Sequence, residues 1–370
     1  MIVMKVTYRI GSCLVLLLAL LLTACTADDS NGSQGNERRL QVSLATNAYQ
    51  NGGGVTRGLP TGYEPLTVST AFPNGKDLYA FFTHTTNASE VYVRRLEYQT
   101  DWQKNITITD ISEPYCIYGF VPISDDTSDN VSINLLNGKT SYADGVEMTV
   151  NNLKPLTVSD PCVIVGVKDY GTATSIADVD VKLGAFTYSF SADNTYDRIC
   201  MLLDHLFASV RFNIAVDEGY AALRTIKLKT MTLSTSSASV KATVTLTSNT
   251  TGANPVDQVS YTTAGAGTAS ATFFESNTGI AVTAANAEAI KQYYCCFAPS
   301  LSNALTLTST YDVYDKTGTK KIRANCTASN KLPSITASRG ERVTYDLTIK
   351  PTYLYQLSDP DLDNPTVVVN

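Results

Sequence analysis

The chain has 370 residues, of which 44% are hydrophobic and 17% charged, and it carries a formal net charge of −6. These values exclude a disordered chain and are typical of a protein with a sizeable core. The acidic balance gives no reason to expect nucleic-acid binding, because phosphate recognition needs clustered cations. Only two histidines are present, which leaves little scope for histidine-based catalysis. We therefore expect no enzyme, no cofactor and no nucleic-acid partner.

The range 1–24 is expected to be a lipoprotein signal peptide. Lys5 and Arg9 supply positive charge, and the range 14–22 is an apolar run that is too short for a resident transmembrane helix. The residues Leu-Thr-Ala then precede Cys25 in a pattern that resembles a lipobox. We expect Cys25 to be acylated and to anchor the chain in a membrane. The alternative is an ordinary signal peptide in which Cys25 is incidental.

Alternation of apolar and polar residues predicts many strands. Leu40, Val42 and Leu44 form the first such run, and others are centred on 106–108, 210–214, 226–228, 244–246, 305–307 and 343–349. Each run is typical of a half-buried strand. Turn sequences rich in glycine, asparagine and aspartate separate them, and one short helix is predicted over 283–290. The pattern favours an all-β fold built of sandwiches.

Motifs that would carry chemistry are scarce. Apart from Cys13 and Cys25, the chain has the cysteines Cys116, Cys162, Cys200, Cys295, Cys296 and Cys326. They are too few for a disulfide scaffold and lack CxxC spacing, so we expect buried free thiols and no metal site. His205 precedes an alternating run and is interpreted as a packed or capping residue. The range 359–370 begins like a calcium loop but lacks its glycine and its final glutamate, which indicates a solvated turn.

Several segments, in this order and spacing, resemble a Bacteroidales fimbrillin, the subunit family of type V pili. They are Thr56-Arg57-Gly58, the ranges 72–80, 159–166 and 203–214, the range 339–345 that begins Arg-Gly, and the tail 351–355. Asp28 and Asp29 also resemble the acidic surface-export signal of Bacteroidetes lipoproteins. The resemblance covers nearly the whole chain after Cys25. It implies a lipid-anchored precursor on the surface of the outer membrane.

The same resemblance implies two tandem transthyretin-like β-sandwich domains with one or two short helices. The expected divisions are a signal peptide over 1–24, a tether and removable first strand over 25–57, an N-terminal sandwich over 58–195, and a C-terminal sandwich with a candidate donor tail over 196–370.

Fimbrillins are assembled after an Arg-specific protease removes an N-terminal segment that contains the first strand. By resemblance, Leu40, Val42 and Leu44 would belong to that removable strand. Arg57 follows a glycine-rich stretch of the kind that proteases prefer, so it is the expected cleavage residue. Arg38 and Arg39 are rival cleavage residues, and both are expected to lie before the strand.

The vacated groove would be filled by a strand from another subunit. The expected donor is the β-branched tail Val367, Val368 and Val369, although a tail that folds back on its own domain is an open alternative. The implied function is a structural fimbrial subunit, shaft or tip, that supports adhesion and biofilm formation. Its implied partners are other fimbrial subunits, the outer membrane, the protease and a receptor on a host or bacterial surface. The alternative is a surface glycan-binding lipoprotein of a polysaccharide-utilisation system.

Overall fold

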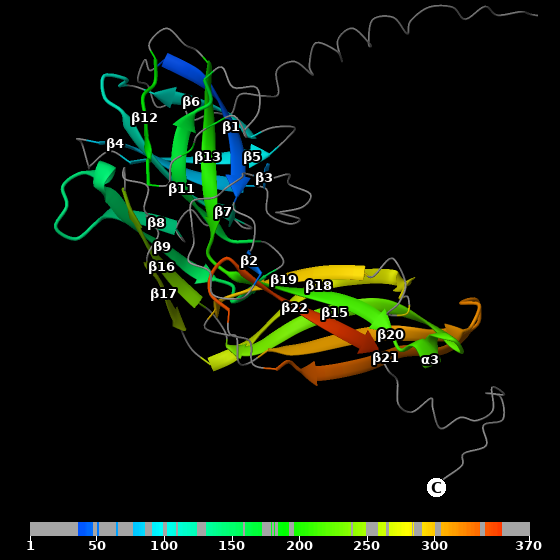
Figure 1. Ribbon diagram of the computed structural model, residues 1–370. Coiled ribbons are helices and arrows are strands. Elements are labelled where there is room, and N and C mark those ends of the chain that lie inside the picture. The colour runs from blue at the N-terminus through cyan, green and yellow to red at the C-terminus, as the bar shows by residue number, and fades with distance from the viewer. Residues whose placement is uncertain are drawn as a thin grey trace, which may run out of the picture.

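The computed structural model describes residues 36–46, 50–51, 64–65, 77–85, 91–98, 102–108, 110–123, 131–157, 160–171, 179, 181, 184–191, 196–237, 240–248, 258–263, 266–282, 284, 291–299, 305–333 and 337–349. These residues form four sheets (Figure 1). The helical elements described are the 3-10 turn η2, Tyr142–Asp144, and α3, Glu218–Ala221. No described helix is long and apolar enough to cross a bilayer. The expected all-β sandwich fold is confirmed.

The largest sheet, sheet A, has nine strands and forms the upper body in Figure 1. Its strands are β1 (Asn36–Thr46), β3 (Glu64–Pro65), β4 (Asp77–His84), β5 (Val91–Tyr98), β6 (Trp102–Ile108), β7 (Tyr115–Ile123), β11 (Cys162–Asp169), β12 (Thr187–Tyr188) and β13 (Tyr196–His205). They follow the order β11-β13-β1-β6-β5-β4-β7-β12, with β3 paired to β1. Because β11 pairs with both β13 and β7, the sheet curls back on itself and encloses a core.

Sheet C covers the outer face of sheet A. It has the order β17-β16-β9-β8, with β8 at Val131–Leu135, β9 at Gly145–Leu153, β16 at Val240–Thr247 and β17 at Gln258–Thr263. Met148 and Val244 of sheet C belong to the same buried cluster as Phe81 and Tyr118 of sheet A. Sheet C thus joins strands from both sides of the division expected at residue 195, and β13, which follows that residue, pairs within sheet A.

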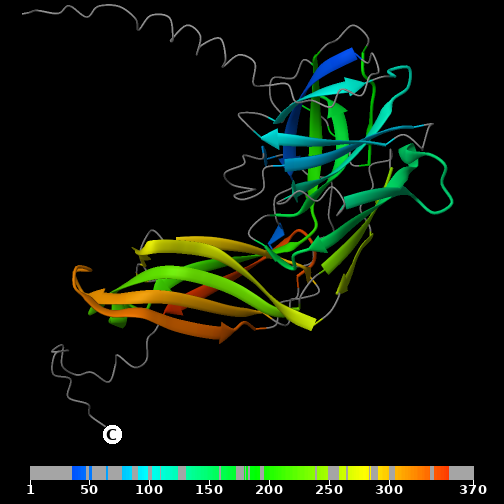
Figure 2. The ribbon, with the colours of Figure 1, turned by 180° about the vertical axis from the view of Figure 1, so that it is seen from behind.

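Two further sheets form the lower body. Sheet B has the order β10-β19-β14-β22-β2, with β10 at Leu156–Thr157, β19 at Lys291–Phe297, β14 at Ala208–Val216, β22 at Glu341–Ile349 and β2 at Gln50–Asn51. Sheet D has the order β18-β15-β20-β21, with β18 at Ala266–Ala281, β15 at Arg224–Ser237, β20 at Thr306–Asp315 and β21 at Lys321–Lys331. Figure 2 shows sheet D from its outer side, in green to orange. The two sheets share buried residues such as Phe212 and Ile226.

The buried residues fall into two clusters. One lies inside the curl of sheet A and contains Leu40, Phe82, Ile117 and Met201. The other runs without a break from the outer face of sheet A through sheet C into the sandwich of sheets B and D. The upper and lower bodies are therefore held by one shared core, while the interior of sheet A has a core of its own.

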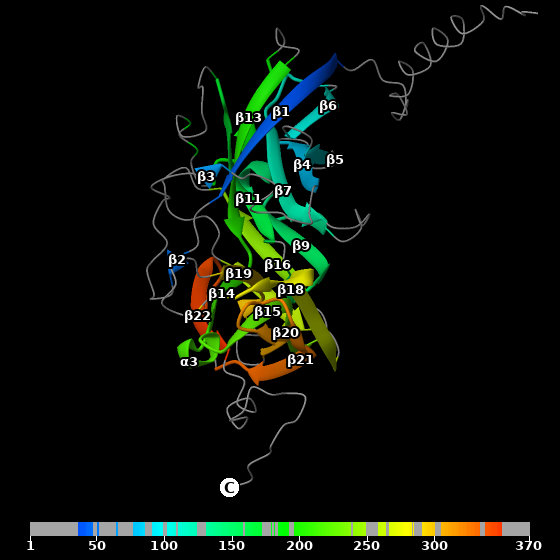
Figure 3. The same ribbon diagram turned by 90° about the vertical axis from the view of Figure 1, so that its right-hand side faces the viewer.

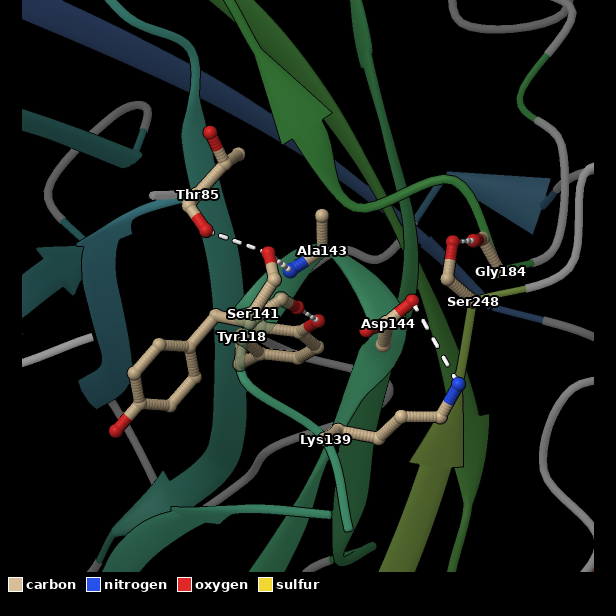
Figure 4. Close-up of polar contacts among 9 residues, drawn as sticks. Thr85, Tyr118, Lys139, Ser141, Ala143, Asp144, Gly184 and Ser248 are labelled. Carbon is tan, nitrogen blue, oxygen red and sulfur yellow. Dashed lines mark hydrogen bonds and ion pairs between the residues drawn. The ribbon is translucent and has the colours of Figure 1, made fainter. Parts of the chain in front are cut away.

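Polar contacts fix the turn between β8 and β9 against its surroundings (Figure 4). The Tyr118 hydroxyl of β7 donates a hydrogen bond to the carbonyl of Tyr142, and Ser141 Oγ donates one to the carbonyl of Thr85. On the other side of the turn, the amide of Ser248 donates to the carbonyl of Asp144 at 3.0 Å. Because buried polar groups need such partners, these contacts fix the position of sheet C on sheet A.

The predicted strand runs are confirmed as β1, β6, β14, β15, β16, β20 and β22. The expected helix over 283–290 lies outside the described residues except for Ala284, which forms an isolated bridge with Val216. The range 359–370, with its interpretation as a solvated turn, also lies outside them.

Candidate functional site

The first strand, β1, lies in the interior of sheet A. On one side it pairs in parallel with β13, from Arg39 opposite Tyr196 to Thr46 opposite Leu203. On the other side it pairs antiparallel with β6, from Asn36 opposite Ile108. Figures 1 and 3 show β1 in dark blue beside the green β13. The strand therefore contributes two ladders of hydrogen bonds to the sheet.

The apolar side chains of β1 point into the core of sheet A. Leu40, Val42 and Leu44 are 0%, 2% and 3% exposed, and they share a cluster with Ile199 and Met201 of β13. The residues between them face outward and are half-buried. The alternation along the sequence thus places every second side chain of β1 in the core.

The position expected for Arg38 and Arg39 is wrong. Both residues lie inside β1, with Arg38 opposite Ile106 and Arg39 opposite Asn105 and Tyr196. The strand begins at Asn36 because β6 extends far enough to pair with it, which the apolar alternation does not reveal. A protease needs an unpaired, extended segment, so β1 must open before a cut there.

The chain after β1 reaches the other body. Gln50 and Asn51 form β2, which pairs in parallel with Glu341 and Arg342 at the start of β22, as Figure 3 shows. Within the part of the chain that the structure describes, β22 beyond Arg342 pairs on one side only, with β14. One N-terminal segment therefore supplies an inner strand to sheet A and a short edge strand to sheet B.

Five of the residues expected to function lie outside the described residues. They are Cys25, Arg57, Val367, Val368 and Val369. Their expected roles in lipidation, cleavage and strand donation stay predictions.

A second group of side chains gathers where the chain passes from β13 to β14. Three segments of the sequence resemblance meet there: Asp160-Pro161-Cys162 at the start of β11, Asp204-His205 at the end of β13, and Arg339-Gly340 just before β22. The amide of Leu206 donates to the carbonyl of Pro161 at 2.7 Å, and the amide of Gly340 donates to the carbonyl of Phe207 at 2.8 Å. The three segments 160–162, 204–208 and 339–340 together are called the joint below.

Asp160, Cys162 and His205 form a compact cluster in the joint. Cys162 lies directly opposite His205 in the ladder between β11 and β13, and its Sγ is 3.6 Å from His205 Nδ1. The same Nδ1 is 2.8 Å from Asp160 Oδ2. The side chains of His205 and Asp160 are 3% and 14% exposed. His205 is thus a packed residue, as expected, with an acidic partner.

An ion pair holds the backbone of the cluster in place. Arg339 Nη1 donates to Asp204 Oδ2 at 2.9 Å and to the carbonyl of His205 at 3.1 Å. The amide of His205 in turn donates to Asp204 Oδ1 at 2.9 Å. Since Arg339 precedes β22 and Asp204 is the penultimate residue of β13, this pair connects sheet B to sheet A.

The six described cysteines are buried thiols that form no disulfide, as expected. Burial raises the pKa of Cys116, Cys200 and Cys295 to about 12. Burial also raises the pKa of Cys162 well above its usual range, and Asp160 and Asp204 add to the rise. Since the thiolate is the reactive form, these four thiols are not nucleophiles at neutral pH.

The cluster in the joint is a feature that spacing along the chain does not reveal. Cys162 and His205 are 43 residues apart, and neither belongs to a short ligand motif. The signal that could have found them is their position beside two apolar runs, 163–165 and 199–203, which form parts of β11 and β13. Two strand ends that pair bring opposite residues into contact.

Comparison with known proteins gives structural likeness only. No protein-family model matches the chain, and no curated protein matches it. Solved structures of similar fold include a fimbrial protein from Bacteroides vulgatus (TM-score 0.34, 14% identity, 83% of this chain and 94% of that one) and a candidate cell adhesion protein from Bacteroides fragilis (TM-score 0.40, 11% identity, 85% and 94%). A third is a candidate cell adhesion protein from Bacteroides eggerthii (TM-score 0.34, 10% identity, 92% and 94%). At these TM-scores the functional argument rests on the residues of this chain.

Proposed function

We propose that the protein is a structural subunit, shaft or tip, of a surface fimbria that serves adhesion and biofilm formation. In this proposal the subunit is assembled by proteolytic removal of its first strand and by insertion of a strand from another subunit. The observation that carries the proposal is β1, an N-terminal strand that lies inside a sheet and fills part of its core.

The free energy at stake in the removal of β1 is large. Burial of Leu40, Val42 and Leu44 contributes about 5–9 kcal/mol, at roughly 1.5–3 kcal/mol for each large aliphatic side chain. Removal also leaves the facing donors and acceptors of β6 and β13 without partners, which is costly in a buried position. A cut subunit would therefore bind an incoming β-strand strongly, by addition to the opened sheet.

A cut after Arg57 would also remove β2, because β2 lies between β1 and that residue. Among the residues that the structure describes, the edge of β22 would then be open along its whole length to a second contact with the incoming chain. Val343, Tyr345 and Leu347 on β22 are partly buried against the core, so this edge offers apolar contacts as well as backbone groups. The proposed donor is the tail Val367, Val368 and Val369.

Export in this proposal follows the lipoprotein route. Cys25 is acylated and holds the precursor at the outer membrane, facing outward, until the protease releases it. Arg57 is the proposed cleavage residue because Arg38 and Arg39 are paired within β1, Arg38 with β6 and Arg39 with both β6 and β13. The partners are other fimbrial subunits, the Arg-specific protease and a surface receptor.

The test is incubation of the purified precursor with an Arg-specific protease. We expect a new N-terminus at Gly58 and ladders of non-covalent oligomers on a gel run without heating. Arg57→Lys should abolish both, whereas Arg38→Lys with Arg39→Lys should leave both unchanged. Deletion of 364–370 should keep the cut and remove the ladders. A precursor that stays uncut and monomeric under these conditions would refute the proposal and favour the anchored glycan-binding lipoprotein.

A further inference from the structure

Asp160, Cys162 and His205 present three different ligand types at one point. Their Oδ, Sγ and Nδ1 atoms all lie within 4.8 Å of one another. Cys162 is 1% exposed and His205 is 2% exposed. Thiolate, imidazole and carboxylate are the three protein ligands of zinc. We propose that these residues bind a divalent transition-metal cation of the zinc class, and this proposal does not depend on the proposed function.

The spacing of the atoms fits a tetrahedral cation. Zinc bonds of about 2.0 Å to nitrogen and about 2.3 Å to sulfur place the two ligand atoms roughly 3.5 Å apart at a tetrahedral angle. The distance between Cys162 Sγ and His205 Nδ1 is 3.6 Å. The 2.8 Å between His205 Nδ1 and Asp160 Oδ2 is a hydrogen-bond distance that must widen by a few tenths of an ångström. Asp160 is the most exposed member of the cluster, so its side chain has room for this movement.

The charge of the surroundings also favours a cation. The carboxylate of Asp160 and the thiolate of Cys162 would balance the two positive charges of the metal. The second acid nearby, Asp204, is already paired with Arg339 at 2.9 Å and so adds no net charge. The negative charge of Asp160, whose Oδ2 is 2.8 Å from His205 Nδ1, attracts a divalent cation to this point.

Hydrogen bonds from neighbouring residues hold the proposed metal ligands in position. His205 is fixed by the hydrogen bond of its amide to Asp204 and by that of Arg339 to its carbonyl. Such supporting contacts orient a metal ligand before the metal binds. Cys162 is fixed by its ladder with β13. The fourth position would be taken by water at the partly exposed side of Asp160.

Binding at this place would be structural. As the sulfur–metal bond forms, the thiol S–H bond breaks and its proton passes to water. The Nδ1 proton that His205 shares with Asp160 moves through water to Nε2, so that the neutral imidazole binds the metal through the Nδ1 lone pair. No group changes its oxidation state. The metal would tie the start of β11 to the end of β13, where the chain leaves sheet A for sheet B. It would thus stiffen the joint between the two bodies.

The test uses the full purified chain without an affinity tag, freed of metal and titrated with Co²⁺. We expect one Co²⁺ per chain, a cobalt–thiolate charge-transfer band, and a rise in melting temperature of about 4 °C at a hundredfold excess over the dissociation constant. Cys162→Ser should abolish the band. Cys200→Ser, which alters an equally buried thiol outside the cluster, should leave the band intact.

Asp160→Asn is a second variant in case Cys162→Ser fails to fold. Asp160 reaches the surface, so the fold should tolerate this substitution. This variant should keep its circular dichroism spectrum and bind Co²⁺ at least tenfold more weakly. The proposal is overturned if the unmodified chain shows no band, if the band persists in Cys162→Ser, or if Asp160→Asn binds Co²⁺ as well as the unmodified chain does. In each of those cases the cluster is a hydrogen-bonded joint only.

Discussion

Arg339 and Asp204 form a buried ion pair although they are 135 residues apart in the sequence, with Nη1 2.9 Å from Oδ2. Their side chains are 12% and 8% exposed. The pair connects the segment before β22 to the end of β13, so it bridges the lower and the upper body. Such a pair is costly to break, because removal of one member leaves the other charged and buried.

We therefore expect Arg339→Met to lower the free energy of unfolding by about 3–5 kcal/mol. The matched control is Lys139→Met, which breaks an exposed pair with Asp144 whose atoms are 3.9 Å apart and should cost no more than about 1 kcal/mol. Urea unfolding measures both. Equal losses of stability in the two variants would show that the pair of Arg339 and Asp204 stabilises the fold no more than the exposed pair does.

Leu40 of β1 should contribute to the stability of the intact chain and not to that of the cut chain. Leu40→Ala removes a fully buried side chain and should cost about 2–5 kcal/mol. Gln41→Ala, on the outward face of the same strand, should cost less than about 0.5 kcal/mol. After a cut at Arg57 and exchange of the strand, the melting temperature should no longer depend on residue 40. Continued dependence would mean that β1 stays in place.

Gly145 should be intolerant of any side chain. Its φ is 120°, and an added Cβ would lie 2.0 Å from the carbonyl oxygen of Leu246 on β16. Gly145→Ala should therefore separate β9 from β16 and lower the melting temperature sharply. Gly138→Ala is the control, because its φ of 76° is also left-handed but nothing lies within 4 Å of the added Cβ. That variant should lose only about 1–2 kcal/mol. Similar losses would exclude the close approach as the cause.

The buried thiols predict a loss of stability in alkali. The pKa values of Cys116, Cys200 and Cys295 are raised by burial from 9.0 to about 12. Between these values the unfolded chain releases thiol protons that the folded chain keeps, so stability is complete below pH 9 and falls as the pH rises. The slope should reach about 1.4 kcal/mol per pH unit for each thiol. Urea midpoints from pH 8 to pH 10.5 measure it, and Cys200→Ala should reduce the slope by one thiol. A slope unchanged by that substitution would contradict the assignment.

The strands were predictable because burial on one face imposes a period of two on the sequence. Leu40, Val42 and Leu44 illustrate this, since each lies in the core of sheet A as its alternation indicates. The same pattern does not show at which residue a strand begins or ends. Arg38 and Arg39 show no alternation that marks them as β1, and only pairing with neighbouring strands places them inside it, with β6 for both and with β13 as well for Arg39.

The partners of a strand could not be read from local pattern. Nothing near Leu40 indicates that β1 pairs in parallel with β13. Likewise, no local pattern indicates that β9 and β16 share a sheet. The joint shows the same limit in side chains. His205 was predictable as a packed residue, but its contacts with Asp160 and Cys162 arise only when β11 and β13 align.

The parallel ladder between β1 and β13 also sets an order of events during biosynthesis. A nascent chain leaves the ribosome with β1 first. Arg39 can pair early with Asn105 of β6, but its second neighbour, Tyr196 of β13, emerges much later. Pairing over such a span is slow, because the entropy of closing a long loop must be overcome first. Leu40, Val42 and Leu44 thus lack Ile199 and Met201 of β13, their partners in the core, until about half of the polypeptide is made. A chaperone that shields this segment during synthesis would raise the yield of folded protein.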